Sequence, residues 1–365
     1  MTGSSGAGER RAARLRECLA AADLDALLVT TLVDARYLTG FTGSSAVVVA
    51  VPDGGVLLTD FRYTEQSAAQ VQPPYEPRIV TGEPLEKIGG VLPAGGRLGF
   101  DERAITVREH GKLGDVVGPA WELVAVENPV AKLREVKEAD EVAALRAAAE
   151  IADAAMSEVL EAGLVGRSER DVATALEFAM RRRGATSASF PSIVAAGEHG
   201  SRPHAEVTDA AIASDVLVTI DWGALHAGYC SDCTRTFATG EGVGELEREI
   251  YDVTLKSQLA GLQFLAAGRT GREVDAAARA VIDAAGYGEN FGHGLGHGVG
   301  LEIHEPPRLA KLGGDAPLVI GNAVTVEPGI YIAGTGGVRI EDLVVVGDGA
   351  NEILTSLSKD LTFVA

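Results

Sequence analysis

Four carboxylates and one imidazole stand in short, unusual sequence settings in the C-terminal part of the chain. Asp221 follows the apolar run VLVTI, and Asp232 comes eleven residues later in GYCSDCTRTF. Glu327 lies in AVTVEPGIY and Glu341 in GVRIED. His297 lies in the glycine-rich stretch FGHGLGHGVGLEIHE. We therefore treat these five side chains together as one candidate site.

This group is the ligand set expected for two hard or borderline divalent ions. Carboxylates can bridge two metals ~3.5–4 Å apart, and a water held between the metals loses a proton near neutral pH. Oxygen-rich coordination favours Mn²⁺, Co²⁺ or Fe²⁺ over a thiolate zinc site. Taken singly, a strand-end Asp is more often a cap, a lone His a hydrogen-bonded residue and a hairpin Glu a solvated one. Their joint occurrence indicates two divalent ions, Mn²⁺ first, with Co²⁺, Fe²⁺ or Zn²⁺ as alternatives.

Two predicted β-hairpins would bring the carboxylates together. The glycines of WGALHAGY suit a turn, so Asp221 and Asp232 can face each other across the first hairpin. Glu327 and Glu341 belong to two strands joined by AGTGG, which predicts the second hairpin. The alternating glycines around His297 allow the backbone to approach a ligand or another strand closely.

Other catalytic chemistries lack their motifs. The chain contains no HExxH, no GxSxG and no P-loop GK[ST]. Cys230 and Cys233 form a CxxC, but residues three apart on a strand point to opposite faces. We therefore predict that both cysteines are small core residues and that they form neither a zinc site nor a redox pair.

The elements that must position the site divide the chain into two domains. Residues 1–130 alternate short strands and helices, which is typical of an α/β domain. Residues 131–365 alternate amphipathic helices with antiparallel β-rich segments, which indicates an α+β domain. The helices predicted in the first domain are Arg10–Ala22 and Asp60–Ala69, with a hairpin turning at Pro52–Gly55. In the second domain, Leu133–Ala155 is predicted to form one or two helices, followed by helices Ser168–Arg183, Gly244–Ala267 and Glu273–Ala285 and strands Val216–Asp221, Thr234–Phe237, Ala323–Ile332 and Gly337–Val346.

Composition excludes several classes of partner. Of the 365 residues, 52 are acidic and 32 basic, and the net charge of −20 repels phosphate backbones and anionic lipid. No apolar run approaches the ~18 residues that span a bilayer, and the N-terminus has no apolar signal-peptide core. Three cysteines do not form a disulfide framework. We expect a cytoplasmic protein with no nucleic acid or membrane partner.

The ordered set IDWGA, YCSDCTRTF, HGLGHGVGLEIHE, VEPGIY and VRIED resembles the pita-bread metallopeptidases. The branch it resembles is that of the Xaa-Pro aminopeptidases (aminopeptidase P) and prolidases. The similarity runs from about Leu133 to the C-terminus, and YLTGFTGSSA and TDFRYTEQ resemble the N-terminal domain of that branch. The resemblance implies a creatinase-type α/β domain over residues 1–130 and an α+β pita-bread (creatinase/aminopeptidase-like) catalytic domain over residues 131–365.

The resemblance also assigns the metal ligands. It implies that the second Asp and the last Glu of the set bridge both ions and that the first Asp binds one of them. The implied ligands are Asp221, Asp232, His297, Glu327 and Glu341.

Five residues receive implied roles around the substrate. His204, in SRPHA, and His304 would contact the substrate carbonyl and stabilise the tetrahedral oxyanion. Glu327 would relay a proton between the attacking water and the leaving proline nitrogen. Arg339 would pair with a ligand carboxylate and orient it. His293 would either support the site or make a purely structural hydrogen bond, and both interpretations stay open.

The implied function is that of a dinuclear-metal exopeptidase that acts on proline-containing peptides. It would hydrolyse the Xaa-Pro bond at the peptide N-terminus through a metal-bridging hydroxide. The proline nitrogen carries no hydrogen and its ring fixes the backbone, so peptidases that bind a backbone N–H at this position cannot engage it. The N-terminal strings resemble the short bacterial aminopeptidases P, which makes an aminopeptidase the expectation.

The alternative is a prolidase that acts on dipeptides only. Arg308, in HEPPRLAK, stands where several prolidases carry an arginine that clamps the free carboxylate of the dipeptide. An exposed loop charge is the other interpretation of Arg308.

Three other functions fit the sequence motifs less well than a metallopeptidase does. Metal-free creatinase-type C–N hydrolysis and a non-catalytic pita-bread binding module both predict the loss of ligand carboxylates, and none is lost here. A methionine aminopeptidase would not need the first ~130 residues. The resemblance further implies a homodimer in which the first domain helps to roof the neighbouring active site.

Overall fold

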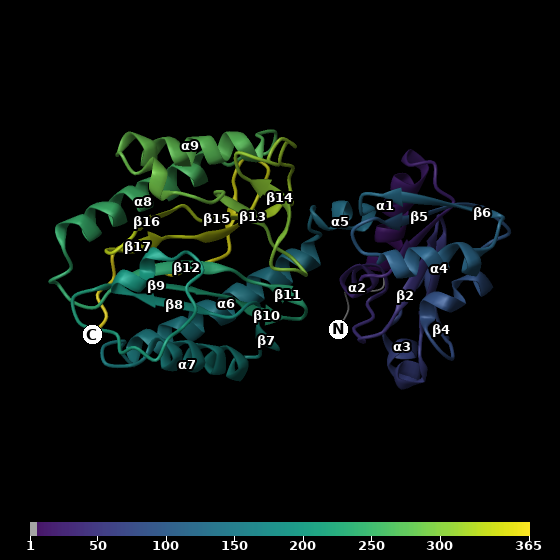
Figure 1. Ribbon diagram of the computed structural model, residues 1–365, viewed down its shortest axis with the longest axis horizontal. Coiled ribbons are helices and arrows are strands. Elements are labelled where there is room, and N and C mark those ends of the chain that lie inside the picture. The colour runs from purple at the N-terminus through teal and green to yellow at the C-terminus, as the bar shows by residue number, and fades with distance from the viewer. Residues whose placement is uncertain (1–5) are drawn as a thin grey trace. The chain divides into compact units, whose positions relative to one another are not determined.

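The computed structural model describes residues 6–365, and the chain divides into two compact units, residues 1–134 and 135–365 (Figure 1). The first unit extends past residue 130 because helix α5 (Pro129–Arg134) belongs to it. Arg134 Nη1 lies 2.7 Å from Oδ1 of Asp34, and both side chains are at most 3% exposed. This buried ion pair fixes the end of α5 within the first unit.

The first unit has a six-stranded sheet in the order β4-β3-β2-β1-β5-β6. Its two central strands are buried on both faces, and the β2–β3 hairpin turns where the sequence predicts it. The helix predicted at Asp60–Ala69 begins with a 3₁₀ turn, Phe61–Tyr63, in which the Asp60 carboxylate accepts the N–H of Arg62. The strands are β1 (Ala26–Val29), β2 (Val47–Val51), β3 (Gly54–Thr59), β4 (Tyr75–Ile79), β5 (Gly96–Asp101) and β6 (Trp121–Val126), and the helices before α5 are α1 (Ala7–Ala21), α2 (Leu32–Thr39), α3 (Thr64–Gln70) and α4 (Val107–Val117).

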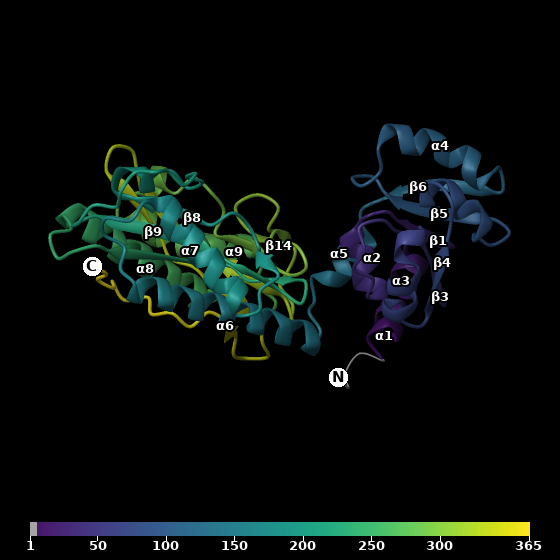
Figure 2. The ribbon, with the colours of Figure 1, turned by 90° about the horizontal axis from the view of Figure 1, so that it is seen from below.

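The second unit places strands between two pairs of helices, as Figures 1 and 2 show. One core joins the first helix pair to the inner strands through residues such as Leu176, Ile220 and Trp222. Another core joins the second pair to the C-terminal strands through residues such as Ile282 and Val324. The helices are α6 (Ala139–Glu161), α7 (Glu169–Arg182), α8 (Glu245–Phe264) and α9 (Gly271–Ala284).

The strands of the second unit form several small sheets. The orders are β12-β9-β8, β11-β10-β7, β14-β13-β15-β18-β19 and β16-β17. Their bounds are β7 (Ser187–Ala188), β8 (Ile193–Ala196), β9 (Leu217–Trp222), β10 (Ala224–His226), β11 (Tyr229–Cys230), β12 (Cys233–Ala238), β13 (Gly296–Gly298), β14 (Glu305–Leu309), β15 (Ala323–Val326), β16 (Gly329–Ile332), β17 (Gly336–Arg339), β18 (Asp342–Val345) and β19 (Glu352–Ile353).

Local capping signals decide where the helices begin. The Ser168 hydroxyl accepts the N–H of Asp171 at the start of α7, and Thr270 and Glu273 form a capping box at the start of α9. The predicted helical stretch Leu133–Ala155 is split because Glu138 is extended and caps α6.

The predicted strands Ala323–Ile332 and Gly337–Val346 are each interrupted in the middle. The outer halves pair as β16 with β17, and the inner halves pair as β15 with β18. At the interruption, the N–H of Glu327 donates to the Leu295 carbonyl at 2.8 Å, and that of Glu341 donates to the Thr234 carbonyl at 3.1 Å. Both glutamates therefore leave their own hairpin and join neighbouring segments of the chain.

No helix within residues 6–365 combines the length and the apolar character needed to cross a bilayer.

Candidate metal centre

The β9–β12 hairpin brings two aspartates to one face. Asp221 lies one residue before the end of β9 and pairs with Thr234 of β12. Asp232 precedes β12 and is two residues from Thr234, so it shares a face with Asp221 as a diagonal neighbour. Trp222 and Cys233 point to the other face, where both are fully buried in the core. Strand alternation therefore sends the aspartates into the site.

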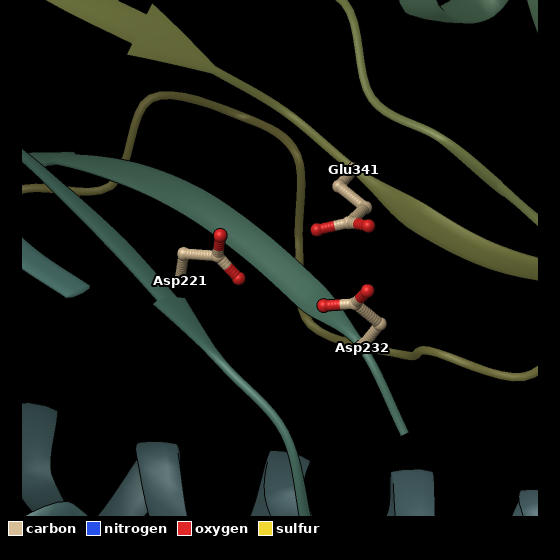
Figure 3. A group of neighbouring side chains, drawn as sticks. All are labelled: Asp221, Asp232 and Glu341. Atoms are coloured by element: carbon tan, nitrogen blue, oxygen red, sulfur yellow. The ribbon is translucent and has the colours of Figure 1, made fainter. Parts of the chain in front are cut away.

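Glu341 joins this pair from the interrupted C-terminal hairpin. Carboxylate oxygens of Asp221, Asp232 and Glu341 all lie within 4.8 Å of one another. Figure 3 shows the three carboxylates pointing toward one another from different segments of the chain. Asp232 is 5% exposed and Glu341 1% exposed, so this is a buried concentration of negative charge.

His297 and Glu327 extend the cluster beyond these three residues. His297 Nε2 lies 3.6 Å from Oδ2 of Asp232 and 3.2 Å from Oε1 of Glu327. His297 Nδ1 donates to the Gly298 carbonyl at 3.0 Å, which fixes the ring with Nε2 toward the carboxylates. Asp232 thus lies between two groups of ligand atoms, one with Asp221 and Glu341 and the other with His297 and Glu327.

Tight strand packing explains the glycine beside His297. A Cβ on Gly296 would lie 2.0 Å from the carbonyl oxygen of Thr325. The Thr325 hydroxyl accepts the N–H of His297 at 3.1 Å and donates to Oε1 of Glu327 at 2.9 Å. The close approach of β13 to β15 therefore orients both candidate ligands.

The electrostatics show that the cluster is short of positive charge. Burial, and then the charges of Glu341 and Asp221, raise the pKa of Asp232 well above its ordinary value. Burial, and then the charges of Glu327 and Asp221, do the same to the pKa of Glu341. Although burial acts in the opposite direction, the hydrogen bond from His297 lowers the pKa of Glu327 to about 2.

The donor set fits two divalent cations. In addition to the charge shortage, Oδ1 of Asp221 is buried and has no hydrogen-bond partner. A buried carboxylate oxygen is costly unless it is hydrogen-bonded or binds a metal. The ligand types, four carboxylates and an imidazole Nε2, are those that hard and borderline divalent ions prefer.

Arg339 is the buried cation beside the cluster. Its Nη2 donates to Oδ2 of Asp221 at 2.8 Å and its Nε to the Thr234 hydroxyl at 3.1 Å. Its Nη1 donates to the Tyr331 hydroxyl at 2.8 Å and to the Pro203 carbonyl at 3.2 Å. The guanidinium, 4% exposed, therefore connects a candidate ligand to the segment that carries His204.

His293 is connected to the site through Tyr331. Its Nδ1 lies 2.8 Å from the Gly294 carbonyl, and its Nε2 lies 3.0 Å from the Tyr331 hydroxyl. The Gly294 carbonyl can only accept, so Nδ1 carries the ring proton. In a neutral ring Nε2 then has no hydrogen and accepts from the Tyr331 hydroxyl. Burial lowers the pKa of His293, which agrees with a neutral ring. Among the described residues, His293 forms no hydrogen bond or ion pair with the five candidate ligands.

His304, His204 and Arg308 lie at the exposed side of the cluster. The ring centroids of His304 and His297 are 4.3 Å apart. Burial lowers the pKa of His304, and so do the charges of His297, His204 and Arg308, whereas that of Glu327 raises it. Arg308, on β14, is the register partner of His297, so both side chains lie on the same face of the sheet.

Three residues of the site were not predicted from the sequence. Thr234 donates to Oε2 of Glu341 at 2.8 Å, as Thr325 does to Glu327. Both threonines are two residues from a candidate ligand on a strand, so alternation could have identified them. Strand alternation could not have identified Tyr331, because the chain is interrupted at Glu327, before the strand that carries Tyr331 begins.

The two cysteines of the CxxC are core residues, as predicted. Both are free and buried. Cys233 packs in the core under α6 and α7, whereas Cys230 packs in a separate cluster with Leu145 and Val299.

Comparison with known proteins agrees with this geometry. Residues 143–348 match the model of metallopeptidase family M24, and residues 11–136 match the creatinase/prolidase N-terminal domain. The uncharacterized peptidase YqhT of Bacillus subtilis is 43% identical over 95% of this chain and 98% of its own length. The predicted fold class, a creatinase-type domain before a pita-bread domain, is confirmed by these matches together with the solved structures.

Two solved structures cover nearly the whole chain. The Xaa-Pro dipeptidase from Bacillus anthracis is 40% identical with a TM-score of 0.92, and the match covers 98% of this chain and 100% of that one. The X-Pro aminopeptidase from Thermotoga maritima MSB8 is 32% identical with a TM-score of 0.85, and the match covers 93% and 97%. Since a dipeptidase and an aminopeptidase both match, the fold alone does not determine substrate length.

Proposed function

The chain belongs to metallopeptidase family M24, and we propose that it hydrolyses the bond between an N-terminal residue and a following proline with two bound divalent ions. The observation that carries this proposal is the position of Asp232. Its carboxylate lies near those of Asp221 and Glu341 on one side and near His297 Nε2 on the other. A carboxylate between two groups of donors can bridge a pair of metal ions, which is the role that the resemblance implies for Asp232 and for Glu341.

We assign the metal ligands as the sequence predicts, with Mn²⁺ as the first choice of ion. When bound, such a pair supplies an acidified water and polarises the substrate carbonyl. The chain itself holds the ligands in place through the Thr325 and Thr234 hydroxyls. The proposed ligands are Asp221, Asp232, His297, Glu327 and Glu341.

The proton and the oxyanion are handled by residues at the edge of the cluster. Glu327 is 16% exposed in its side chain and stays ionised, so it can accept a proton and pass it to the leaving proline nitrogen. His304 is neutral at pH 7 because its pKa is lowered, and its ring N–H can donate to a carbonyl oxygen. His204 follows Pro203, whose carbonyl accepts from Arg339, and would share this role.

The position of Arg308 favours dipeptides over longer peptides. The side chain is exposed, lies on the His297 face of the sheet and has no carboxylate within ion-pair distance among residues 6–365. A free guanidinium beside the site suits bidentate capture of the carboxylate of a dipeptide. The sequence alone favoured an aminopeptidase, whereas the placement of Arg308 shifts the proposal toward an Xaa-Pro dipeptidase.

An Xaa-Pro aminopeptidase is the second candidate. It is favoured by TGFTGSS and DFRYTEQ, the N-terminal strings that resemble the short bacterial aminopeptidases P. The solved X-Pro aminopeptidase matches the chain over nearly its full length, which keeps this candidate in consideration.

The deciding experiment is hydrolysis after Mn²⁺ loading. Ala-Pro and Ala-Pro-Ala are compared as substrates, beside a sample treated with chelator. Chelator-sensitive cleavage of the dipeptide alone would support the dipeptidase, and cleavage of the tripeptide would support the aminopeptidase. No cleavage of either peptide would contradict the proposed function.

We also propose that the chain acts as a homodimer. The support is the resemblance to proteins in which the first domain covers a neighbouring active site. Light scattering should give twice the 37.8 kDa mass of one chain, and a monomeric mass would contradict the proposal.

A further inference from the structure

A single buried carboxylate holds both ends of the segment that carries His204. This segment, residues 196–208, is called here the His204 loop. Glu169 accepts the N–H of Ala196 at 2.9 Å through Oε1. Through Oε2 it accepts the N–H and the hydroxyl of Thr208, at 3.0 and 2.7 Å. Both ends of the loop are therefore attached to one side chain.

A third residue of the loop, His199, reaches the same carboxylate. His199 Nδ1 lies 2.9 and 3.0 Å from the two oxygens of Glu169. Glu169 is 2% exposed, so these donors take the place of water around a buried charge. A carboxylate with this many donors makes a stiff attachment, because losing any one leaves a buried polar group unpaired.

Glu169 itself stands on a rigid element. It is the first residue of α7, whose start is capped by Ser168 and whose Val172 and Leu176 are fully buried in the core. A negative charge at a helix N-terminus is also favoured by the helix dipole. The His204 loop is thereby fixed to the helix layer below the sheet.

The middle of the loop is fixed at the metal centre. A Cβ on Gly337 would lie 2.2 Å from the carbonyl oxygen of Gly200, so the loop runs directly against β17. The carbonyl of Pro203 accepts from Nη1 of Arg339, which also holds Asp221. The next residue is His204, whose own side chain is exposed. Its position is therefore set by the backbone of the loop rather than by contacts of the imidazole.

We propose that Glu169 is a positioning residue for the reaction, because it fixes the His204 loop so that the imidazole meets the substrate carbonyl. This inference rests on the proposed function, since it takes His204 as a group that touches the substrate. Glu169 acts through the loop and does not reach the reacting atoms. Misplacing a catalytic group by about 1 Å can cost roughly 100-fold in rate.

A double-mutant cycle between Glu169 and His204 tests this inference. Glu169→Gln keeps the size of the side chain but replaces one acceptor oxygen with an N–H₂ group that faces other donors. We expect it to lower kcat/KM for the cleaved peptide by roughly 10- to 100-fold, mostly through kcat. In the His204→Ala background, the same change should cost about 3-fold or less, because the group that it positions is gone. Multiplicative losses would overturn the inference.

Asp153→Asn is the matched control. Asp153 is a buried carboxylate on α6 that accepts the N–H and hydroxyl of Ser356, and it bonds neither to the His204 loop nor to a candidate ligand among the described residues. Asp153→Asn should lower the free energy of unfolding about as much as Glu169→Gln does, but its kcat should stay within about 3-fold of wild type. If Glu169→Gln does not fold, His199→Ala is used in its place. The His199 side chain is partly exposed, and its substitution removes only one of the donors to Glu169.

Hydrogen exchange gives a readout that does not depend on activity. Glu169→Gln should speed exchange of the amides in residues 196–208 at least 10-fold, and exchange in β15 and β18 should stay unchanged. Unchanged exchange in the His204 loop would refute the anchoring. A wild-type chain that cleaves neither peptide would instead overturn the proposed function and the catalytic part of this inference, and exchange would still decide the anchoring.

Discussion

Arg339 donates one hydrogen bond of 2.8 Å to Oδ2 of Asp221, while Oδ1 of the same carboxylate is buried without a partner. The guanidinium therefore orients Asp221 but satisfies only one of its oxygens. Leaving a buried charged acceptor unsatisfied costs about 1–3 kcal/mol or more. The Asp221 carboxylate lies beside those of Asp232 and Glu341. A cation bound among these three carboxylates would give the free oxygen of Asp221 a partner.

Replacing Asp232, the proposed shared ligand, should abolish catalysis and leave the fold intact. We expect Asp232→Asn to lower kcat/KM by roughly 10²–10³-fold or more, because the residue lies between both groups of donors. Metal content by mass spectrometry should fall, and the far-UV circular dichroism spectrum should match that of wild type. Near-normal turnover would exclude Asp232 as a shared ligand.

The same substitution should stabilise the metal-free protein at neutral pH. Burial and neighbouring carboxylates raise the pKa of Asp232 above its ordinary 3.8 in the folded state. An acid with a raised folded pKa loses stability as the pH rises from its unfolded pKa through its folded pKa. In chelator, the Tm of Asp232→Asn minus that of wild type should therefore be near zero at about pH 4 and grow toward about pH 8.

A gain of ~1 kcal/mol would raise Tm by roughly 2–4 °C. Adding Mn²⁺ should reverse the order, because wild type alone would bind the ions fully. A Tm difference that is constant with pH would show that the buried carboxylates are not short of positive charge.

Arg308→Ala should separate dipeptides from longer peptides. If the guanidinium binds the carboxylate of Ala-Pro, its removal costs about 1.5–3 kcal/mol, or roughly 10- to 100-fold in kcat/KM for the dipeptide. Hydrolysis of Ala-Pro-Ala, if present, should change by less than about 3-fold. Arg272→Ala is the control, since Arg272 is an exposed arginine paired with Asp315. Equal losses on both peptides would rule out the clamp.

Tyr331→Phe should weaken both stability and catalysis. The hydroxyl accepts from Arg339 and donates to His293, so its loss leaves one N–H of the buried Arg339 and Nε2 of the partly buried His293 without this partner. We expect a loss of about 1–3 kcal/mol in the free energy of unfolding, measured with urea.

Tyr331→Phe should also lower kcat while the bound metal content stays unchanged. The reason is that Tyr331 holds Arg339, which orients Asp221 and the His204 loop. Tyr251→Phe is the matched control: that hydroxyl is bound to a single backbone carbonyl, of Lys359, and kcat should be unaffected. Full activity of Tyr331→Phe would show that Arg339 is held without the tyrosine.

The candidate ligands could be identified from sequence because each one stands within a local pattern. Asp221 and Asp232 flank a turn-rich stretch, and strand alternation places them on one face whatever the rest of the chain does. The helix start at Ser168 also follows from a local hydrogen bond between a side chain and the nearby backbone. The last helix starts at its Thr270 cap, slightly before the predicted Glu273. Such features depend on neighbours a few residues away.

Contacts between distant residues could not be identified in this way. The attachment of the His204 loop to Glu169 joins residues 27 to 39 positions apart, and Arg339 reaches Pro203 across 136 positions. The interruption of the C-terminal hairpin has the same origin, because the N–H groups of Glu327 and Glu341 bond to other segments.

The sequence by itself determined most of the helices and hairpins, the ligand types and the expectation of two metal ions. Only the tertiary structure showed that the Asp232 carboxylate lies near those of Asp221 and Glu341 and also near His297 Nε2. It also placed Arg308 on the His297 face of the sheet, Tyr331 against Arg339 and Glu169 against both ends of the His204 loop. The physical reason is that periodicity and capping act over a few residues of the chain. The convergence of buried charges instead depends on how separate strands and helices pack, and no short stretch of the sequence encodes that packing.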